Sequence, residues 1–209
     1  MKAPTPHDVA DLLDWKREIF ELYETARAES PYPEAWEQWV LGRDRLFRYH
    51  PSSPLPPAER KAFEKLPYFD HDPAARVLAF VEPTEATTMD IAASAGETVR
   101  FTRFATATFE LKGMMQHLAL YWLEGYGGGL FVPFRDATSG RSTYGAGRYL
   151  LDTVKGADLG WEEGRLVLDF NFAYNPSCSY DESWVCPLAP PENRLVIAIE
   201  AGERYPQER

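Results

Sequence analysis

Most of the chain after Arg76 consists of short segments in which apolar and polar residues alternate, with glycine-containing turns between many of them. Alternation with a period of two is typical of half-buried strands. Because no helical segment lies between these strands, consecutive ones should pair directly, which favours an antiparallel β-barrel or sandwich of about eight strands over a parallel sheet. The segments that we expect as strands are Val77–Glu82, Thr87–Ala92, Val99–Phe101, Phe104–Leu111, Leu118–Trp122, Leu130–Phe134, Thr143–Leu151, Arg165–Phe172 and Leu195–Glu200.

The N-terminal segment, residues 1–66, has a helical period instead. Thr5 can cap a first helix, and Asp8 suits the positive end of that helix. A second helix follows the prolines near position 32, and a short third one is expected before Pro67. We expect the helices to cover an open side of the barrel and to bury three large aromatic residues, Phe20, Trp36 and Trp39.

Size and composition favour one domain over residues 1–209, with a β-rich α+β fold whose antiparallel region spans 76–203. A net charge of −10 argues against a nucleic-acid partner, since phosphate binding requires Lys and Arg, and against an anionic membrane surface. No segment approaches the roughly 18 consecutive apolar residues of a membrane helix. The first residues lack the apolar core of a secretory signal, so we expect a cytoplasmic protein.

The expected strand Thr143–Leu151 contains two glycines at alternate positions. Tyr144 and Arg148 would share one face of this strand, and Gly145 and Gly147 would share the other. Glycines inside a strand mark a bulge or a close approach by another backbone or a ligand. Both interpretations remain open: a slot for a ligand, or a corner of the barrel.

A second polar pattern follows in the strand before Pro176. Asp169 and Asn171 would lie on the face opposite to Tyr174 and its neighbouring phenylalanines. If the aromatic face forms the core, the polar face is solvated. If the polar face lines the interior instead, Asp169 must be paired, and Arg148 or Arg135 is its natural partner.

Arg135 precedes a segment with strong turn chemistry, Asp136 to Gly140. The Asp136 carboxylate can accept a hydrogen bond from the backbone N–H two residues on, and Gly140 can adopt a positive φ. The sequence therefore predicts an Asx turn, which leaves Arg135 either solvated or available to an anion.

Cys178 and Cys186 enclose a seven-residue loop. A disulfide is sterically possible, but two buried free thiols are favoured in a reducing cytoplasm. A zinc site is disfavoured because neither C-x-x-C nor H-x-x-x-H accompanies the cysteines. Flanking prolines should keep the loop ordered, with Tyr180 and Trp184 packed inward.

Three functional hypotheses follow. The first is a small-molecule-binding module whose ligand is polar or anionic, since an eight-stranded barrel has room for one small ligand. The second is an enzyme, such as a hydrolase, that uses Asp169 or Cys178 with Arg148; the third is a protein-interaction domain. The sequence identifies no cofactor, metal ligand or catalytic group and does not give the oligomeric state. The residues expected to bind a ligand are Arg135, Tyr144, Gly145, Gly147, Arg148, Asp169, Asn171 and Tyr174.

Several motifs of this chain resemble those of a known family. They are the run from His50 to Leu55, FRDATSGRSTYGAGRYL, LDFNFAYNPSCSYDESWVCPLAPPENRL and the closing Ala201-Gly202-Glu203. On these motifs the chain looks like a member of domain-of-unknown-function family 1684, over most of its length. The resemblance implies a soluble prokaryotic protein in which these motifs belong to one domain, and it implies no activity, cofactor or catalytic residue.

Overall fold

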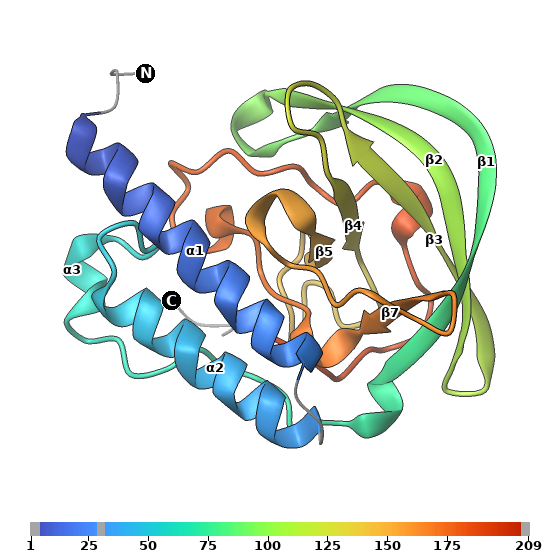
Figure 1. The fold of residues 1–209 in the computed structure, drawn as a ribbon, viewed down its shortest axis with the longest axis horizontal. Coiled ribbons are helices and arrows are strands. Elements are labelled where there is room, and N and C mark those ends of the chain that lie inside the picture. Colours follow the sequence, from blue (N-terminus) through green and yellow to red (C-terminus); the bar gives the residue numbers. More distant parts are fainter. Residues whose placement is uncertain (1–4, 29–31, 206–209) are drawn as a thin grey trace.

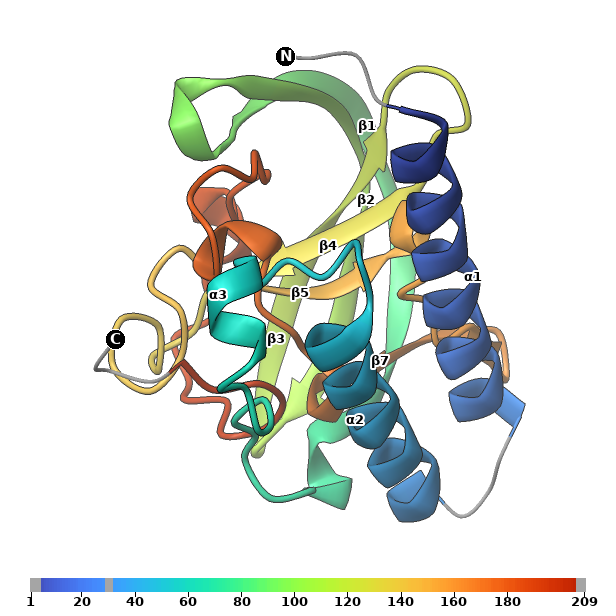
Figure 2. The same ribbon diagram turned by 90° about the vertical axis from the view of Figure 1, so that its left-hand side faces the viewer.

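The computed structural model describes residues 5–28 and 32–205, and it shows helices packed on a curved antiparallel sheet (Figures 1 and 2). The strand order, β5-β4-β3-β2-β1-β7-β6, leaves β5 and β6 at the edges. The predicted β-rich α+β class is thus confirmed, with a seven-stranded open sheet in place of a closed barrel. The elements are α1 (Pro6–Ala28), α2 (Tyr32–Tyr49), α3 (Pro57–Arg60), β1 (Arg76–Ala92), β2 (Thr98–Leu111), β3 (Met114–Leu123), β4 (Leu130–Phe134), β5 (Arg148–Asp152), β6 (Trp161–Glu162) and β7 (Arg165–Asp169).

Six short 3₁₀ turns connect these elements within the described ranges. They are η1 (Pro73–Ala75), η2 (Ser94–Gly96), η3 (Thr153–Lys155), η4 (Phe170–Phe172), η5 (Ser177–Ser179) and η6 (Pro191–Asn193). None of the helices in the described ranges is long and apolar enough to cross a membrane.

The first helix begins as the sequence predicts. The Asp8 N–H donates to the Thr5 hydroxyl at 3.2 Å, and the Thr5 N–H donates to the Asp8 carboxylate at 2.8 Å, which is a reciprocal cap. Helices α1 and α2 then lie side by side against one side of the molecule (Figure 2).

The buried face of the helices is aromatic. Trp39 is fully buried and meets Tyr23 and Phe172 edge to face, at ring-centroid distances of 5.8 and 5.0 Å. The prediction that the helices bury Trp39 is therefore confirmed, and Trp36 is partly buried with its indole N–H bonded to the Asn171 carbonyl. The same prediction is wrong for Phe20, which remains 47% exposed.

Strands β1 and β2 each merge two segments that the sequence separated. In β1 the pairing with β2 shifts register between Pro83 and Thr87, so the residues around Pro83 form a bulge rather than a break. Proline is tolerated at such a position because a bulge interrupts the ladder of N–H donors. A similar shift in the pairing of β2 with β3 lies beside Phe104.

Three expected strands are shorter or absent. Strand β5 begins only at Arg148, because residues 143–147 form a loop, and β7 ends at Asp169 where η4 begins. The segment from Leu195 to Glu200 bends at Val196 and Ile197 and forms no strand. It still shows the expected alternation, since Leu195, Ile197 and Ile199 are buried and Val196 is exposed.

This C-terminal segment closes the main core. Its buried side chains pack against apolar residues from β2, β3, β4 and β7, including Phe109 and Phe134. Asn193 anchors the start of the segment: its side chain accepts from the Ala119 N–H at 2.8 Å and donates to the carbonyls of Ala119 and Pro133. Backbone hydrogen bonds add to this anchor, because the Leu195 N–H donates to the Arg135 carbonyl at 2.8 Å and the Ala137 N–H donates to the Ile197 carbonyl at 3.0 Å.

Candidate functional site

Arg148 is almost completely buried, and its guanidinium group holds the C-terminal segment. One terminal nitrogen donates to the Asp136 carboxylate at 2.7 Å and to the Ile199 carbonyl at 3.0 Å. The other donates to the carbonyls of Ala201 and Glu203. Both terminal nitrogens are therefore occupied by protein oxygens, and the partner carboxylate is Asp136 rather than Asp169.

Asp136 also forms the predicted Asx turn. Its second oxygen accepts from the Thr138 N–H at 2.6 Å and from the Thr138 hydroxyl. Burial lowers the pKa of Arg148 despite the neighbouring Asp136 charge. The turn and the ion pair together form a buried polar cluster that fixes the loop after β4.

Asp169 and Asn171 are buried behind the helices rather than in a pocket. The Asp169 carboxylate accepts from the Asn171 N–H at 3.0 Å and from its side-chain amide at 2.8 Å. The Asn171 side chain also exchanges two hydrogen bonds with the backbone of Asp72. Burial raises the pKa of Asp169, and one of its oxygens has no hydrogen-bond partner.

Gly145 and Gly147 lie in the loop before β5, so the expectation that they lie inside a strand is wrong. Gly147 has a φ of +105°, and a Cβ there would lie 2.5 Å from the Phe134 carbonyl oxygen. Close backbone packing therefore requires this glycine. Tyr144, from the same loop, lies with its hydroxyl 3.9 Å from the Cys178 sulfur and its ring against Tyr205.

The two remaining expected residues line different hollows. Tyr174 lines a cavity beneath the helices, whereas Arg135 lines an open groove near the end of β1. The structure therefore does not bring the eight expected ligand-binding residues together.

The helix-side cavity, as we call the first of these hollows, has a volume of about 70 Å³. Helices α1 and α2 form one wall, and β5, η3 and the segment after Phe172 form the other. Aromatic rings from both walls surround it, with two cationic side chains among them. Its lining residues are Trp15, Ile19, Tyr23, Arg43, Phe47, Pro54, Tyr149, Lys155, Ala157, Tyr174, Asn175, Pro176, Ser177 and Tyr180.

The central charge of this cavity belongs to Arg43, which the sequence analysis missed. Arg43 pairs with the fully buried Glu203 at 3.0 Å, and the same nitrogen donates to the Tyr68 hydroxyl. Its guanidinium carbon lies 4.8 Å from the Trp39 ring centroid and 5.3 Å from that of Tyr174. The sequence does contain a signal that Arg43 is buried. Arg43 lies on the apolar stripe of α2, four residues after Trp39 and four before Phe47.

Glu203 gathers further donors around the cavity. It accepts from the Asn175 N–H at 3.2 Å, from the Asn175 side-chain amide at 3.1 Å and from the Tyr180 hydroxyl. Burial would lower the pKa of Arg43, but Tyr68, Glu203 and other neighbours raise it well above its ordinary value. Arg43 therefore stays charged inside the protein.

Two lining residues carry buried polar atoms without hydrogen-bond partners: the Tyr23 hydroxyl and the Asn175 side-chain oxygen. The Tyr23 hydroxyl lies near the Trp39 indole, but the two make no hydrogen bond of acceptable geometry. Burial raises the pKa of Tyr23, so its hydroxyl remains a neutral donor. Unpaired buried polar atoms are uncommon in folded proteins, and here two of them belong to residues that line one cavity.

The cysteines are buried and unbonded. The Cys178 N–H donates to the Cys186 sulfur at 3.3 Å, and the hydrogen bond from Cys186 lowers the pKa of the Cys178 thiol to about 6. Tyr180 packs on Phe47 as predicted, but Trp184 is 40% exposed, so its predicted inward packing is wrong. Neither Asp169 nor Cys178 lines the helix-side cavity or the groove beside Arg135.

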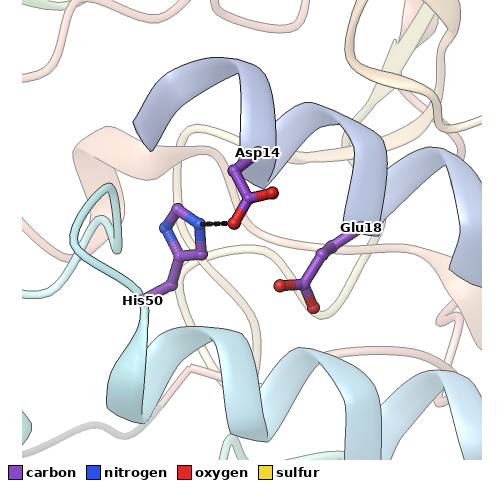
Figure 3. A group of neighbouring side chains, drawn as sticks. All are labelled: Asp14, Glu18 and His50. Atoms are coloured by element: carbon purple, nitrogen blue, oxygen red, sulfur yellow. Dashed lines mark ion pairs between the residues drawn. The ribbon is translucent and has the colours of Figure 1, made fainter. Parts of the chain in front are cut away.

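Asp14 and Glu18 on α1 form a cluster with His50, which directly follows α2, and their ligand-type atoms all lie within 4.8 Å of one another (Figure 3). The Ser52 N–H donates to His50 Nδ1 at 3.0 Å, which leaves the neutral ring protonated at Nε2, the atom 3.6 Å from Asp14. Glu18 is paired with Arg45. These contacts explain the cluster without a metal ion. A metal would need a lone pair at Nε2, which carries the proton in this arrangement.

A family model described as "Protein of unknown function (DUF1684)" matches residues 61–204. The chain belongs to this family. Among solved structures, this DUF1684 protein is similar to an uncharacterized protein of Haloarcula marismortui determined by solution NMR. The two share 39% sequence identity with a TM-score of 0.61, over 84% of this chain and 97% of the other. No curated protein matches the chain.

The DUF1684 match covers only part of the helix-side cavity. Tyr174, Asn175 and Glu203 lie inside the matched residues, whereas Tyr23 and Arg43 lie in the helices before them. The cavity is thus built jointly by the matched region and by the N-terminal helices.

Proposed function

We propose that this protein binds one small polar molecule in the helix-side cavity. The observation that carries the proposal is that two residues lining one aromatic cavity, Tyr23 and Asn175, each carry a buried polar atom without a hydrogen-bond partner. Binding sites of this kind combine an apolar lining with a few polar groups that fix the ligand's orientation.

The polar groups define the chemistry of the ligand. Asn175 uses its amide nitrogen on Glu203 and on the Arg204 carbonyl, which leaves an acceptor for a donor on the ligand. Arg43 makes its hydrogen bonds through one terminal nitrogen, so the rest of its guanidinium can donate. A ligand with an oxygen for Arg43 and Tyr23 and an N–H or O–H for Asn175 satisfies all three.

The volume limits the size of this ligand. A cavity of about 70 Å³ holds roughly five water molecules at 10–15 Å³ each. This suits small hydroxy acids, amino acids or amides. Lys155, which is half exposed, also lines the cavity, and its ammonium group is paired with the Asp152 carboxylate at 3.6 Å.

Tyr23→Phe tests the proposal, because it removes the unpaired hydroxyl and little else. We expect the variant to unfold at the same or a slightly higher temperature, since no hydrogen bond is lost. It should bind at least about tenfold more weakly, since a hydrogen bond to the ligand is lost. The measurement is a thermal-shift and NMR screen of small hydroxy acids, amino acids and amides against both proteins.

Tyr126→Phe serves as the matched control, since Tyr126 is fully exposed in the turn between β3 and β4. It should respond to every compound as the unaltered protein does. A compound that stabilises all three proteins equally would bind elsewhere, and the absence of any stabilising compound would contradict the proposal.

A further inference from the structure

A second hollow, separate from the helix-side cavity, lies between the end of β1 and the segment 188–192. It is an open groove of about 470 Å³ that shares no lining residue with the helix-side cavity. The Leu188 N–H donates to the Ala92 carbonyl at 2.8 Å, which holds the segment against β1. Pro190 and Pro191 stiffen the same wall.

The acidic residues of the groove are already engaged. Arg100 donates to both oxygens of Asp90, at 3.0 and 3.3 Å. Glu192 accepts from the Tyr121 hydroxyl at 2.8 Å. Neither carboxylate pairs with the one arginine in the lining, Arg135.

Arg135 has an unusual environment for an arginine in so acidic a protein, with 32 acidic and 22 basic residues. Its Nε is buried without a hydrogen-bond partner, and its terminal nitrogens form no hydrogen bond or ion pair within the described residues. Its stem is fixed by close packing, because a Cβ on Gly147 would lie 2.9 Å from the Arg135 Cγ. The guanidinium is thus positioned by the loop before β5 but is not neutralised.

We propose that this groove binds a small carboxylate, with the carboxylate on the Arg135 guanidinium. The apolar body of the ligand would lie on Met89, Ile91 and Leu188, which line the same groove. A guanidinium presents planar, paired donors that match the two oxygens of a carboxylate, and the surrounding apolar wall strengthens such a pair. The site is independent of the ligand proposed for the helix-side cavity.

Benzoate is a suitable probe, because it joins a carboxylate to a flat apolar ring. We expect saturable shifts of the Ala146 and Ala189 amide resonances when benzoate is titrated into the ¹⁵N-labelled protein. Arg135→Gln, which keeps part of the stem without the charge, should weaken this binding by roughly tenfold or more. Arg135→Lys keeps the charge without the fork and should weaken it less.

Arg194→Gln is the matched control, since Arg194 is an exposed arginine outside the groove lining. It should bind benzoate as the unaltered protein does. Equal weakening in the Arg135 and Arg194 variants, equal binding of neutral benzamide, or tighter binding of inorganic phosphate would each overturn the proposal. So would the absence of shifts up to the solubility limit of benzoate. If Arg135→Gln does not fold, the comparison of Arg135→Lys with Arg194→Lys decides it.

Discussion

Arg148 and Arg135 both lie at strand ends in a glycine-rich region, yet their guanidinium groups have opposite surroundings. The Arg148 guanidinium meets a carboxylate and three backbone carbonyls, whereas the Arg135 guanidinium makes no hydrogen bond or ion pair within the described residues. A strand pattern gives the face of a side chain but not its partners. For this reason the sequence could predict both arginines as ligand-binding residues. It could not show that the Arg148 guanidinium is bound by the protein itself while the Arg135 guanidinium is not.

Asp169 allows a prediction at the same scale, from the direction of its pKa. Burial raises this pKa above the ordinary 3.8, although Asn171, His71 and Arg76 act in the opposite direction. The protonated form is therefore favoured in the folded state. Protonation of Asp169 therefore stabilises the folded state. This stabilisation is fully present below the pKa of the unfolded state and is lost as pH rises through the higher pKa of the folded state.

The comparison of the unaltered protein with Asp169→Asn isolates this contribution. Asparagine does not titrate. The free energy of unfolding of the unaltered protein should therefore fall relative to that of Asp169→Asn as pH rises from 4 to 7. Urea unfolding at a series of pH values measures it. A difference that does not change with pH, or that changes in the opposite direction, would contradict the raised pKa.

At the scale of elements, local patterns predicted most of the sheet. The cap at Thr5, the Asx turn at Asp136 and the strands β1 to β4 were each predicted from neighbours in the chain, and each is confirmed. The failures depend on distant contacts. The segment 195–200 is held by Arg148, by Asn193 and by backbone hydrogen bonds to residues 135 and 137 rather than by a regular ladder. Gly147 is required by a close backbone contact with Phe134.

Gly202 gives a prediction about one such distant contact. Its φ is +77°, and an added Cβ would lie 2.5 Å from the Phe170 carbonyl and 2.6 Å from that of Ala173. Gly164, in the turn between β6 and β7, has a similar φ of +74° with nothing within 4 Å. Gly202→Ala should therefore cost the backbone strain of about 1–2 kcal/mol plus roughly 1–3 kcal/mol for the overlap.

Gly164→Ala is the matched control and should cost the strain alone. Chemical unfolding of both variants gives the difference in the free energy of unfolding. Equal losses in the two variants would show that the backbone conformation accounts for the whole loss of stability. The close approach at Gly202 would then have no energetic effect.

On the scale of the whole molecule, the Arg43–Glu203 pair joins the two ends of the described chain. Arg43 lies in α2, and Glu203 follows the segment that closes the main core. Sequence reasoning predicted that helices cover the sheet, but it could not find this pair, since 160 residues separate its members. The helix-side cavity depends on the pair, because Arg43 lines it and Glu203 accepts hydrogen bonds from two further lining residues, Tyr180 and Asn175.

This connection predicts strong coupling between the two residues. Glu203→Gln leaves the Arg43 charge buried without its counterion, which should cost about 3–5 kcal/mol. In Arg43→Met the carboxylate is left unpaired, with a similar cost. The double variant should cost clearly less than the sum of the two, and urea unfolding of all four proteins measures this coupling.

Glu18→Gln, in the more exposed pair between α1 and α2, is the control and should cost at most about 1 kcal/mol. Additive losses at Arg43 and Glu203 would mean that each residue is held by its other contacts. The helices would then be joined to the C-terminal segment by aromatic packing rather than by charge.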